Sequence, residues 1–144
     1  MTQAACALCA GDGGEVLFRD RLLRVVLVDD ADYPGFVRVI ANAHVREMTD
    51  LAPAERQRLL EAVLAVEGAQ RDVLAAHKVN LASLGNVTPH LHWHVIPRFA
   101  DDAHFPEAVW GGRQREPDPA RLAERRQRLA ALRSAIAGRM AALG

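Results

Sequence analysis

The sequence has no net charge, few cysteines and no long apolar run. Its 18 basic residues balance 18 acidic ones, which removes the strong field expected of a protein that grips long nucleic acid through phosphates. Cys6 and Cys9 are too few and too close together for the disulfide framework of a secreted protein. No stretch of about 18 apolar residues is present, and the N-terminus lacks a basic segment followed by an apolar one. We therefore expect a cytoplasmic protein that binds neither nucleic acid nor a membrane.

The length and composition predict one globular domain with a sizeable core, since 50% of the 144 residues are hydrophobic and 25% are charged. Apolar residues at helical spacing predict a long helix over residues 53–76, which Pro53 suits as a first position. Short runs rich in β-branched residues predict strands. The expected strands are a hairpin over residues 15–18 and 22–28, then residues 36–40, 79–84 and 89–98, with a single helix from Asp118 to the C-terminus.

Half of the six histidines stand at alternate positions, as His90, His92 and His94. On a strand, side chains two apart share a face, so the three rings line one face while the apolar residues between them face the core. A solvent-exposed face of a sheet needs only ordinary polar residues such as Thr, Lys or Glu, so folding alone does not require three histidines there. The row of histidines therefore calls for a chemical explanation.

Two other polar features have more than one interpretation. Cys6 and Cys9 form a Cys-x-x-Cys pair, which suits incidental thiols, a redox pair or half of a tetrahedral metal site. Asp29 and Asp30 lie in an acidic loop with Pro and Gly, where they are either solvated or accept hydrogen bonds from a ribose diol.

The region around the histidines adds further candidates. Gly85 and Asn86 form a simple turn or supply donors to phosphate oxygens. Trp110 lies in an irregular segment, where it caps a nucleobase, packs against a second subunit or anchors the loop. These alternatives stay open at the level of the sequence.

Residues 90–96 read His-Leu-His-Trp-His-Val-Ile, which resembles the His-x-His-x-His signature of the histidine triad (HIT) superfamily. The resemblance extends from about Cys6 to Trp110. It implies an α+β fold with a roughly five-stranded antiparallel sheet covered by a long helix, usually in a homodimer. Residues 1–112 would form the HIT-like domain, and residues 113–144 would extend the same domain as a basic amphipathic helix.

The resemblance also implies an activity and its site. The activity is hydrolysis or transfer at the α-phosphate of a nucleotide derivative, such as a dinucleoside polyphosphate or a nucleoside phosphoramidate, with release of a nucleoside monophosphate. In the family the middle histidine, here His92, forms a covalent nucleotidyl intermediate. His94 lies on the same face and is a candidate donor to the phosphate oxygens. Val87 stands where some relatives have a phosphate-contacting hydroxyl, for which Thr88 or Ser83 is the candidate replacement. The resemblance makes Asp29 the first choice for the ribose contact and Asp30 the second. The expected substrate-binding residues are Asp29, Gly85, Asn86 and Thr88.

The resemblance extends to a metal. Branches that retain the Cys-x-x-Cys hold a zinc with both cysteines, a histidine after the third strand and the first triad histidine. The matching residues here are Cys6, Cys9, His44 and His90. Four protein ligands close the coordination sphere, so we expect a structural zinc and no catalytic metal. Two alternatives remain: a metal-dependent hydrolase that uses the strand histidines as ligands, and a nucleotide-binding module without turnover.

Overall fold

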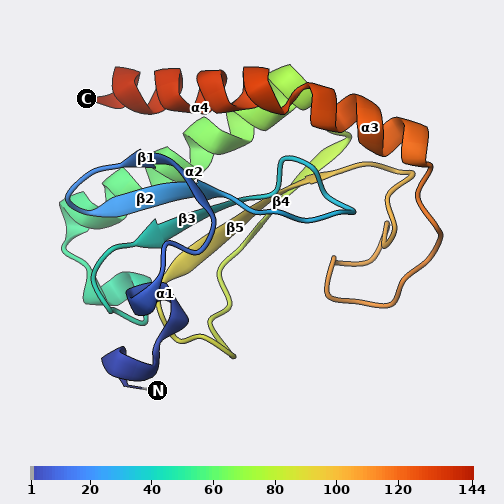
Figure 1. Cartoon of the computed structure of the whole chain (residues 1–144). Coiled ribbons are helices and arrows are strands. Elements are labelled where there is room, and N and C mark those ends of the chain that lie inside the picture. Colours follow the sequence, from blue (N-terminus) through green and yellow to red (C-terminus); the bar gives the residue numbers. More distant parts are fainter. Residues whose placement is uncertain (1) are drawn as a thin grey trace.

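The computed structural model describes residues 2–144 as a five-stranded antiparallel sheet with helices packed against it (Figure 1). The strand order is β1-β2-β3-β5-β4. The strands are β1 (Glu15–Arg19), β2 (Leu23–Leu27), β3 (Val37–Ala41), β4 (Lys78–Ala82) and β5 (His92–Arg98). The helices are η1 (Gln3–Ala5), α1 (Ala7–Ala10), η2 (Met48–Asp50), α2 (Pro53–Leu74), α3 (Pro119–Gln127) and α4 (Leu129–Leu143). The predicted α+β class with an antiparallel sheet and a long helix is confirmed.

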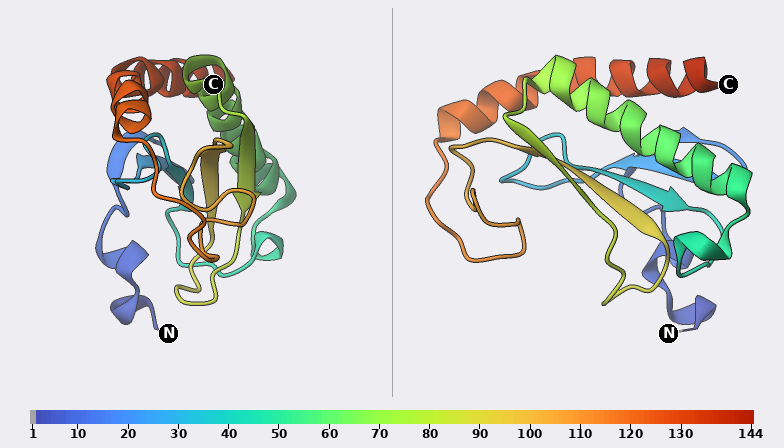
Figure 2. Two further views of the ribbon diagram at one scale, coloured as in Figure 1. Left: turned by 90° about the vertical axis from the view of Figure 1, so that its right-hand side faces the viewer. Right: turned by 180° about the vertical axis from the view of Figure 1, so that it is seen from behind.

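One face of the sheet packs against α2 and α4, which lie side by side above it (Figure 2). Burying an aliphatic side chain contributes roughly 1.5–3 kcal/mol, so this layer supplies the main driving force for folding. The residues of β2 and β3 that point to the helices are Leu23, Val25, Leu27, Val37, Val39 and Ala41, all of them buried.

The opposite face of the sheet carries polar side chains, and we call it the histidine face. In the antiparallel pairing of β3 with β5, Arg38 lies opposite His94 and Ile40 lies opposite His92. The N-terminal segment covers part of this face, because Cys6 packs into an apolar cluster with Ile40. Because successive side chains of β3 and β5 point to opposite faces, the apolar core lies on one face of the sheet and the polar side chains of the histidine face lie on the other.

Helix α2 ties the histidine strand to the core. The backbone N–H of Ala52 donates to the carboxylate of Glu55 at 2.9 Å, which closes the first turn of the helix. Gln70, fully buried, donates through Nε2 to the carbonyl of Val95 at 2.9 Å and to that of Gly35 at 2.8 Å. These bonds fix β5 relative to the helix.

The histidine strand is shorter than predicted, since β5 begins at His92 and not at Pro89. Pro89 has no N–H to donate, and the N–H of His90 bonds to the carbonyl of Thr88 at 2.8 Å in a turn. The prediction that all three histidines share one strand is therefore wrong for His90. Its place just before the strand lets its ring reach the N-terminal segment.

The single C-terminal helix predicted from Asp118 is also wrong, because the helix is interrupted at Arg128. The N–H of Arg128 bonds to the carbonyl of Arg125 at 3.1 Å, which tightens the last turn of α3. Neither glycine nor proline stands at the break, so the sequence pattern contains no sign of it. The change of direction allows α4 to bury Leu132, Ile136 and Met140 completely.

The two ends of the chain lie on opposite sides of the sheet. Helix α1 lies beside the histidine face, whereas α4 lies with α2 on the other face (Figures 1 and 2). Among residues 2–144, none of the helices combines the length and the apolar character needed to cross a lipid bilayer.

Candidate active site and metal centre

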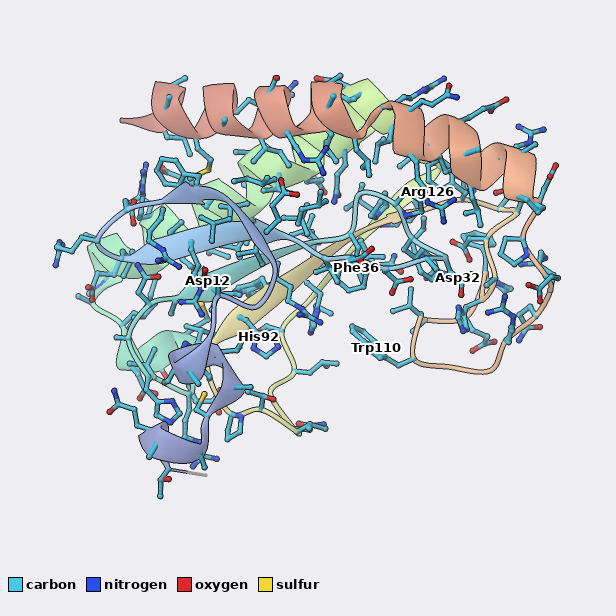
Figure 3. The ribbon with its side chains drawn as sticks, in the orientation of Figure 1. Asp12, Asp32, Phe36, His92, Trp110 and Arg126 are labelled. Carbon is cyan, nitrogen blue, oxygen red and sulfur yellow. The ribbon has the colours of Figure 1, made fainter. Side chains whose placement is uncertain are left out.

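A cavity of about 370 Å³ opens on the histidine face. This volume falls in the range of small-molecule sites. Figure 3 shows His92 on its strand and Trp110 on the loop beside it. The structure thus brings the predicted catalytic histidines together with three of the predicted substrate-binding residues. The lining residues are Arg38, Leu84, Gly85, Asn86, Val87, Thr88, His92, His94 and Trp110.

His92 has one ring nitrogen fixed and the other free. Its Nδ1–H donates to the backbone carbonyl of His90 at 2.5 Å. Because a carbonyl only accepts, this bond places the proton on Nδ1 and the lone pair on Nε2. Burial lowers the pKa of the His92 imidazole, the bond to His90 raises it, and the Arg38 cation lowers it further. The balance keeps the ring neutral, which is the nucleophilic form of histidine.

His94 is packed between other rings. Its ring centroid lies 5.8 Å from that of Phe36 and 4.9 Å from those of His92 and Trp110, each edge to face. Burial first, then the neighbouring His92 imidazole, whose protonation would compete with that of His94, and the charge of Arg38 lower the pKa of His94 to about 4. Its Nδ1 is buried without a hydrogen-bond partner in the chain from residue 2 to 144. His94 thus lines the cavity as a neutral imidazole whose Nδ1 is withdrawn from solvent.

The loop before β5 supplies polar groups to the cavity. Gly85 adopts a φ of +74°, a conformation that residues with a Cβ rarely adopt, so the turn requires glycine. Asn86 and Thr88 both line the cavity. Ser83 does not, because its hydroxyl donates to the carbonyl of His92 at 2.9 Å. Of the two hydroxyls considered for the phosphate, the geometry favours that of Thr88.

Trp110 reaches the cavity on the irregular segment that follows β5. This segment is held by the buried Asp102, which accepts bonds from Arg98 Nε at 2.8 Å and from the N–H of Phe105 at 2.7 Å. Trp110 itself is 52% exposed and packs edge to face on His94. The half-exposed indole forms a wall of the cavity and does not anchor the loop by burial.

The structure does not bring Asp29 together with the histidines. Asp29 is exposed and lines a separate cavity of about 330 Å³, together with Asp30, Arg126 and Arg133. Asp30 accepts a bond from the N–H of Asp32 at 3.0 Å within the same loop. Figure 3 labels Asp32 and Arg126 on this side of the molecule, apart from His92. Neither aspartate lines the histidine cavity, so its lining gives no support to the predicted ribose contact.

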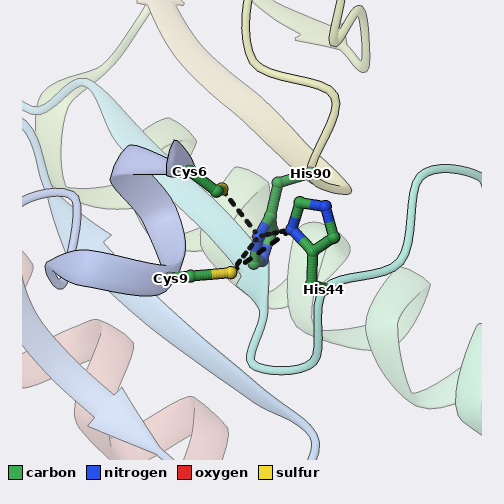
Figure 4. A group of neighbouring side chains, drawn as sticks. All are labelled: Cys6, Cys9, His44 and His90. Atoms are coloured by element: carbon green, nitrogen blue, oxygen red, sulfur yellow. Dashed lines mark hydrogen bonds between the residues drawn. The ribbon is translucent and has the colours of Figure 1, made fainter. Parts of the chain in front are cut away.

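All four residues of the expected metal set lie together (Figure 4). One donor atom of each lies within 4.8 Å of the other three. Nδ1 of His90 is 3.4 Å from Sγ of Cys6, 3.5 Å from Sγ of Cys9 and 3.3 Å from Nδ1 of His44. Tetrahedral zinc with its usual bonds to nitrogen and sulfur places neighbouring donors roughly 3.3–3.8 Å apart. The four side chains therefore fit one metal ion.

Neighbouring residues orient this metal group, which comprises Cys6, Cys9, His44 and His90. Nε2–H of His90 donates to the carbonyl of Ala41 at 2.6 Å, which leaves the lone pair on Nδ1 where a metal would bind. Arg24, only 4% exposed, donates through NH2 to the carbonyls of Leu8 at 2.6 Å and Gly11 at 3.2 Å. The guanidinium thus holds the backbone on both sides of the second cysteine.

Arg24, which holds the backbone around Cys9, and Arg38, which lines the cavity, are the residues at these sites that sequence reasoning missed. Each stands in a predicted strand between apolar neighbours, so each shares a face of the sheet with the histidines. The position of Arg38 between Val37 and Val39 already indicated that its side chain lies on the polar face of the sheet. Only the strand register, which places Arg38 opposite His94, shows that it lies beside the histidines.

A five-stranded antiparallel sheet, with helices on one face and histidines of a His-x-His-x-His run at the other, defines a histidine triad protein. The family model of the HIT domain matches residues 13–101, which is more than half of the chain. The chain therefore belongs to the HIT domain family.

Known proteins of two kinds are similar to this chain. A crystal structure of a histidine triad protein from Bradyrhizobium japonicum has 29% sequence identity and a TM-score of 0.71, covering 87% of this chain and 92% of that one. Bis(5'-nucleosyl)-tetraphosphatase (asymmetrical) from Schizosaccharomyces pombe is 31% identical over 91 residues, 60% of this chain and 50% of the relative. AP-4-A phosphorylase from Mycobacterium tuberculosis is 28% identical over 106 residues, 69% of this chain and 54% of the relative. The chain spans about half the length of these two curated relatives.

Proposed function

We propose that this protein is a nucleotide hydrolase or nucleotidyl transferase that acts at the α-phosphate of a nucleotide derivative. The observation that carries the proposal is the 2.5 Å bond from Nδ1–H of His92 to the carbonyl of His90, which leaves Nε2 as a nucleophile in the cavity. The names of the two curated relatives, a dinucleoside tetraphosphatase and a phosphorylase, support this class of reaction. The substrate type is a dinucleoside polyphosphate or a nucleoside phosphoramidate.

The reaction takes two steps. In the first, Nε2 of His92 attacks the α-phosphorus and forms the N–P bond, while the bond to the leaving group breaks and its electron pair departs with that group. The ring, still protonated on Nδ1, carries a positive charge that the carbonyl of His90 stabilises. In the second step, water attacks the phosphorus, the N–P bond breaks with its electron pair returning to Nε2, and a nucleoside monophosphate and one proton from the water are released to solvent. His92 returns to its neutral form.

Polar groups around His92 stabilise the charge that develops on the phosphate oxygens. His94, kept neutral by burial, donates through a ring N–H. Asn86, the hydroxyl of Thr88 and the backbone at Gly85 supply further donors from the loop. Preorganised donors of this kind commonly contribute several kcal/mol to transition-state stabilisation.

The metal group is proposed to hold a structural zinc. Its four donors would fill a tetrahedral sphere and would leave no open position for an activated water, which supports the covalent reaction over a metal-dependent hydrolase. Bound zinc would join the N-terminal segment to the residue before β5. His92 and His94 stay outside this group of donors.

The His92→Ala variant tests the proposed function. We expect turnover to fall by about three orders of magnitude or more, with nucleotide binding still measurable, because the nucleophile is lost and the cavity is kept. Mass spectrometry of the wild-type protein mixed with adenosine and guanosine polyphosphates should detect a nucleotidyl adduct on His92. His77→Ala, an exposed histidine between α2 and β4, is the matched control and should turn over normally.

Other outcomes would identify the alternatives. A metal-dependent hydrolase loses activity to chelators and forms no adduct. A binding module binds nucleotide and releases no product. A His92→Ala variant that turned over at the normal rate would contradict the covalent mechanism.

A further inference from the structure

Arg24, Arg98 and Arg38 differ in how fully the protein itself uses their donors; Arg24 and Arg98 are buried, whereas Arg38 is partly buried. Arg24 makes four hydrogen bonds to protein acceptors, and Arg98 also makes four. Arg38 makes one, from NH1 to the carbonyl of Gly13 at 3.2 Å. Its Nε is buried and has no partner in the described part of the chain. An N–H group that is withdrawn from water, as this Nε–H is, normally has a hydrogen-bond acceptor.

Arg38 lies where an anionic ligand would sit. It lines the cavity together with His92 and His94, and it pairs with His94 in the β3–β5 register. The described residues that line this cavity include no carboxylate. Asp30, whose charge is felt by Arg38, forms no ion pair with it. The cavity therefore carries, beside the proposed nucleophile, a positive charge that no ion pair within the described residues neutralises.

We propose that Arg38 binds the phosphoryl group of the substrate directly and so selects phosphorylated nucleosides over nucleosides. This inference rests on the proposed function, and it assigns the charge contact that His94, Asn86 and Thr88, being neutral, do not supply. The planar guanidinium presents two parallel N–H donors to two phosphate oxygens. Charge on those oxygens in the transition state strengthens the same contact.

A structural role for Arg38 makes a different prediction. If Arg38 mainly fastened the loop at Gly13 to the sheet, its removal would weaken folding and the binding of every ligand alike. A phosphate contact is lost only by ligands that carry a phosphate. The pair of adenosine and adenosine 5'-monophosphate separates the two roles, and guanosine with its monophosphate extends the test to the other purine.

The test measures the affinity of these four ligands by calorimetry for zinc-loaded full-length protein and three variants. Arg38→Met should bind the monophosphates roughly 10- to 100-fold more weakly, the usual effect of losing charged hydrogen bonds, and bind the nucleosides as wild type does. The monophosphate affinity of Arg38→Lys should lie between those of the wild type and Arg38→Met, since lysine keeps the positive charge but not the two parallel N–H donors of the guanidinium. Arg71→Met, an exposed arginine on α2, should change neither affinity.

Several results would overturn the inference. These are unchanged monophosphate affinity in Arg38→Met, an equal loss for nucleoside and monophosphate, and wild-type protein that binds no monophosphate. Thermal unfolding of each variant separates a lost contact from a lost fold. If no adduct forms on His92 but Arg38→Met still loses monophosphate binding alone, the proposed function fails and the phosphate contact stands.

Discussion

His90 couples the metal group to the proposed nucleophile. Its Nδ1 belongs to the metal group, while its backbone carbonyl accepts the Nδ1–H of His92 at 2.5 Å. Its Nε2–H is held by the carbonyl of Ala41 at 2.6 Å. One residue thus fixes a metal donor and the orientation of the neighbouring ring. We expect that loss of the metal would shift the backbone carbonyl of His90 and so disturb the orientation of the His92 ring.

The His44→Ala variant tests the metal group because it removes one of the four donors. We expect the wild-type protein to carry about one zinc per chain and the variant clearly less. Its thermal midpoint should fall, since metal that binds the folded state stabilises it. Elemental analysis and thermal unfolding, each with and without a chelator, measure both effects.

His77→Ala is the control for this experiment, because it removes a histidine outside the metal group. It should keep its zinc and its response to the chelator. Wild-type protein that contains no zinc after expression in zinc-supplemented medium would contradict the four-ligand assignment.

At the scale of single residues, the sequence predicted the side chains whose chemistry is unusual in any fold. Three alternate histidines and a Cys-x-x-Cys pair have few structural explanations, and the structure brings both groups into sites. Arg38 and Asp29 show where prediction of single site residues from the sequence fails. A single charged residue is usually solvated, and only strand register and loop path decide which cavity it enters. Those depend on distant contacts that a local pattern does not contain.

Among the elements, the irregular segment after β5 depends on Asp102. Burial alone would raise the pKa of Asp102, but bonds from Arg98 and from the N–H groups of Phe99 and Phe105 lower it to about 2. The same carboxylate accepts a bond from the hydroxyl of Tyr33 at 3.2 Å. The position of the cavity wall formed by this segment therefore depends on one ionised group.

The Asp102→Asn variant should be destabilised by about 3 kcal/mol at pH 7, because the buried Arg98 loses its counter-charge. The folded-state pKa of about 2 lies below the reference value of 3.8, so ionised Asp102 stabilises the fold above pH 4. That contribution is lost as the pH falls toward 2. Over this range the wild type should lose about 2 kcal/mol more than the variant. Urea unfolding at a series of pH values measures both free energies.

Asp101→Asn is the neighbouring control. Its side chain is 42% exposed and pairs with Arg125, so its loss should cost about 1 kcal/mol or less. If wild type and Asp102→Asn lost stability in parallel between pH 4 and pH 2, the assigned role of Asp102 would be wrong.

The elements that local pattern predicted best are those with a strict period. The hairpin strands, β3 and α2 lie within two residues of their expected ends, because alternation and helical spacing reflect which side is buried. The break at Arg128 was missed since it depends on tertiary packing. Helix α3 meets the segment after β5 through Arg125 and Asp101, while α4 turns to pack on α2.

At the scale of the whole molecule, one edge of the sheet is covered and the other is open. The outer strand β1 contacts α4, and Arg133 pairs with Glu15 there. The outer strand β4 has an edge without a partner strand within residues 2–144. Helix α2 contacts β4, and its Leu60 and Leu64 are 41% and 56% exposed, while Leu81 of β4 is 39% exposed. An open edge next to apolar side chains is a template for pairing with another chain.

We propose that a second copy of this chain covers the β4 edge and forms a homodimer. Leu64→Glu places a charge on the exposed apolar stripe without disturbing the core, so it should shift the protein toward monomer by at least tenfold in dissociation constant. Sedimentation equilibrium measures this shift. Leu143→Glu, an equally apolar position 39% exposed at the end of α4, is the control and should leave the assembly unchanged. Wild-type protein that sediments as a monomer at micromolar concentration would rule out the dimer, whereas equal weakening by both variants would place the interface elsewhere.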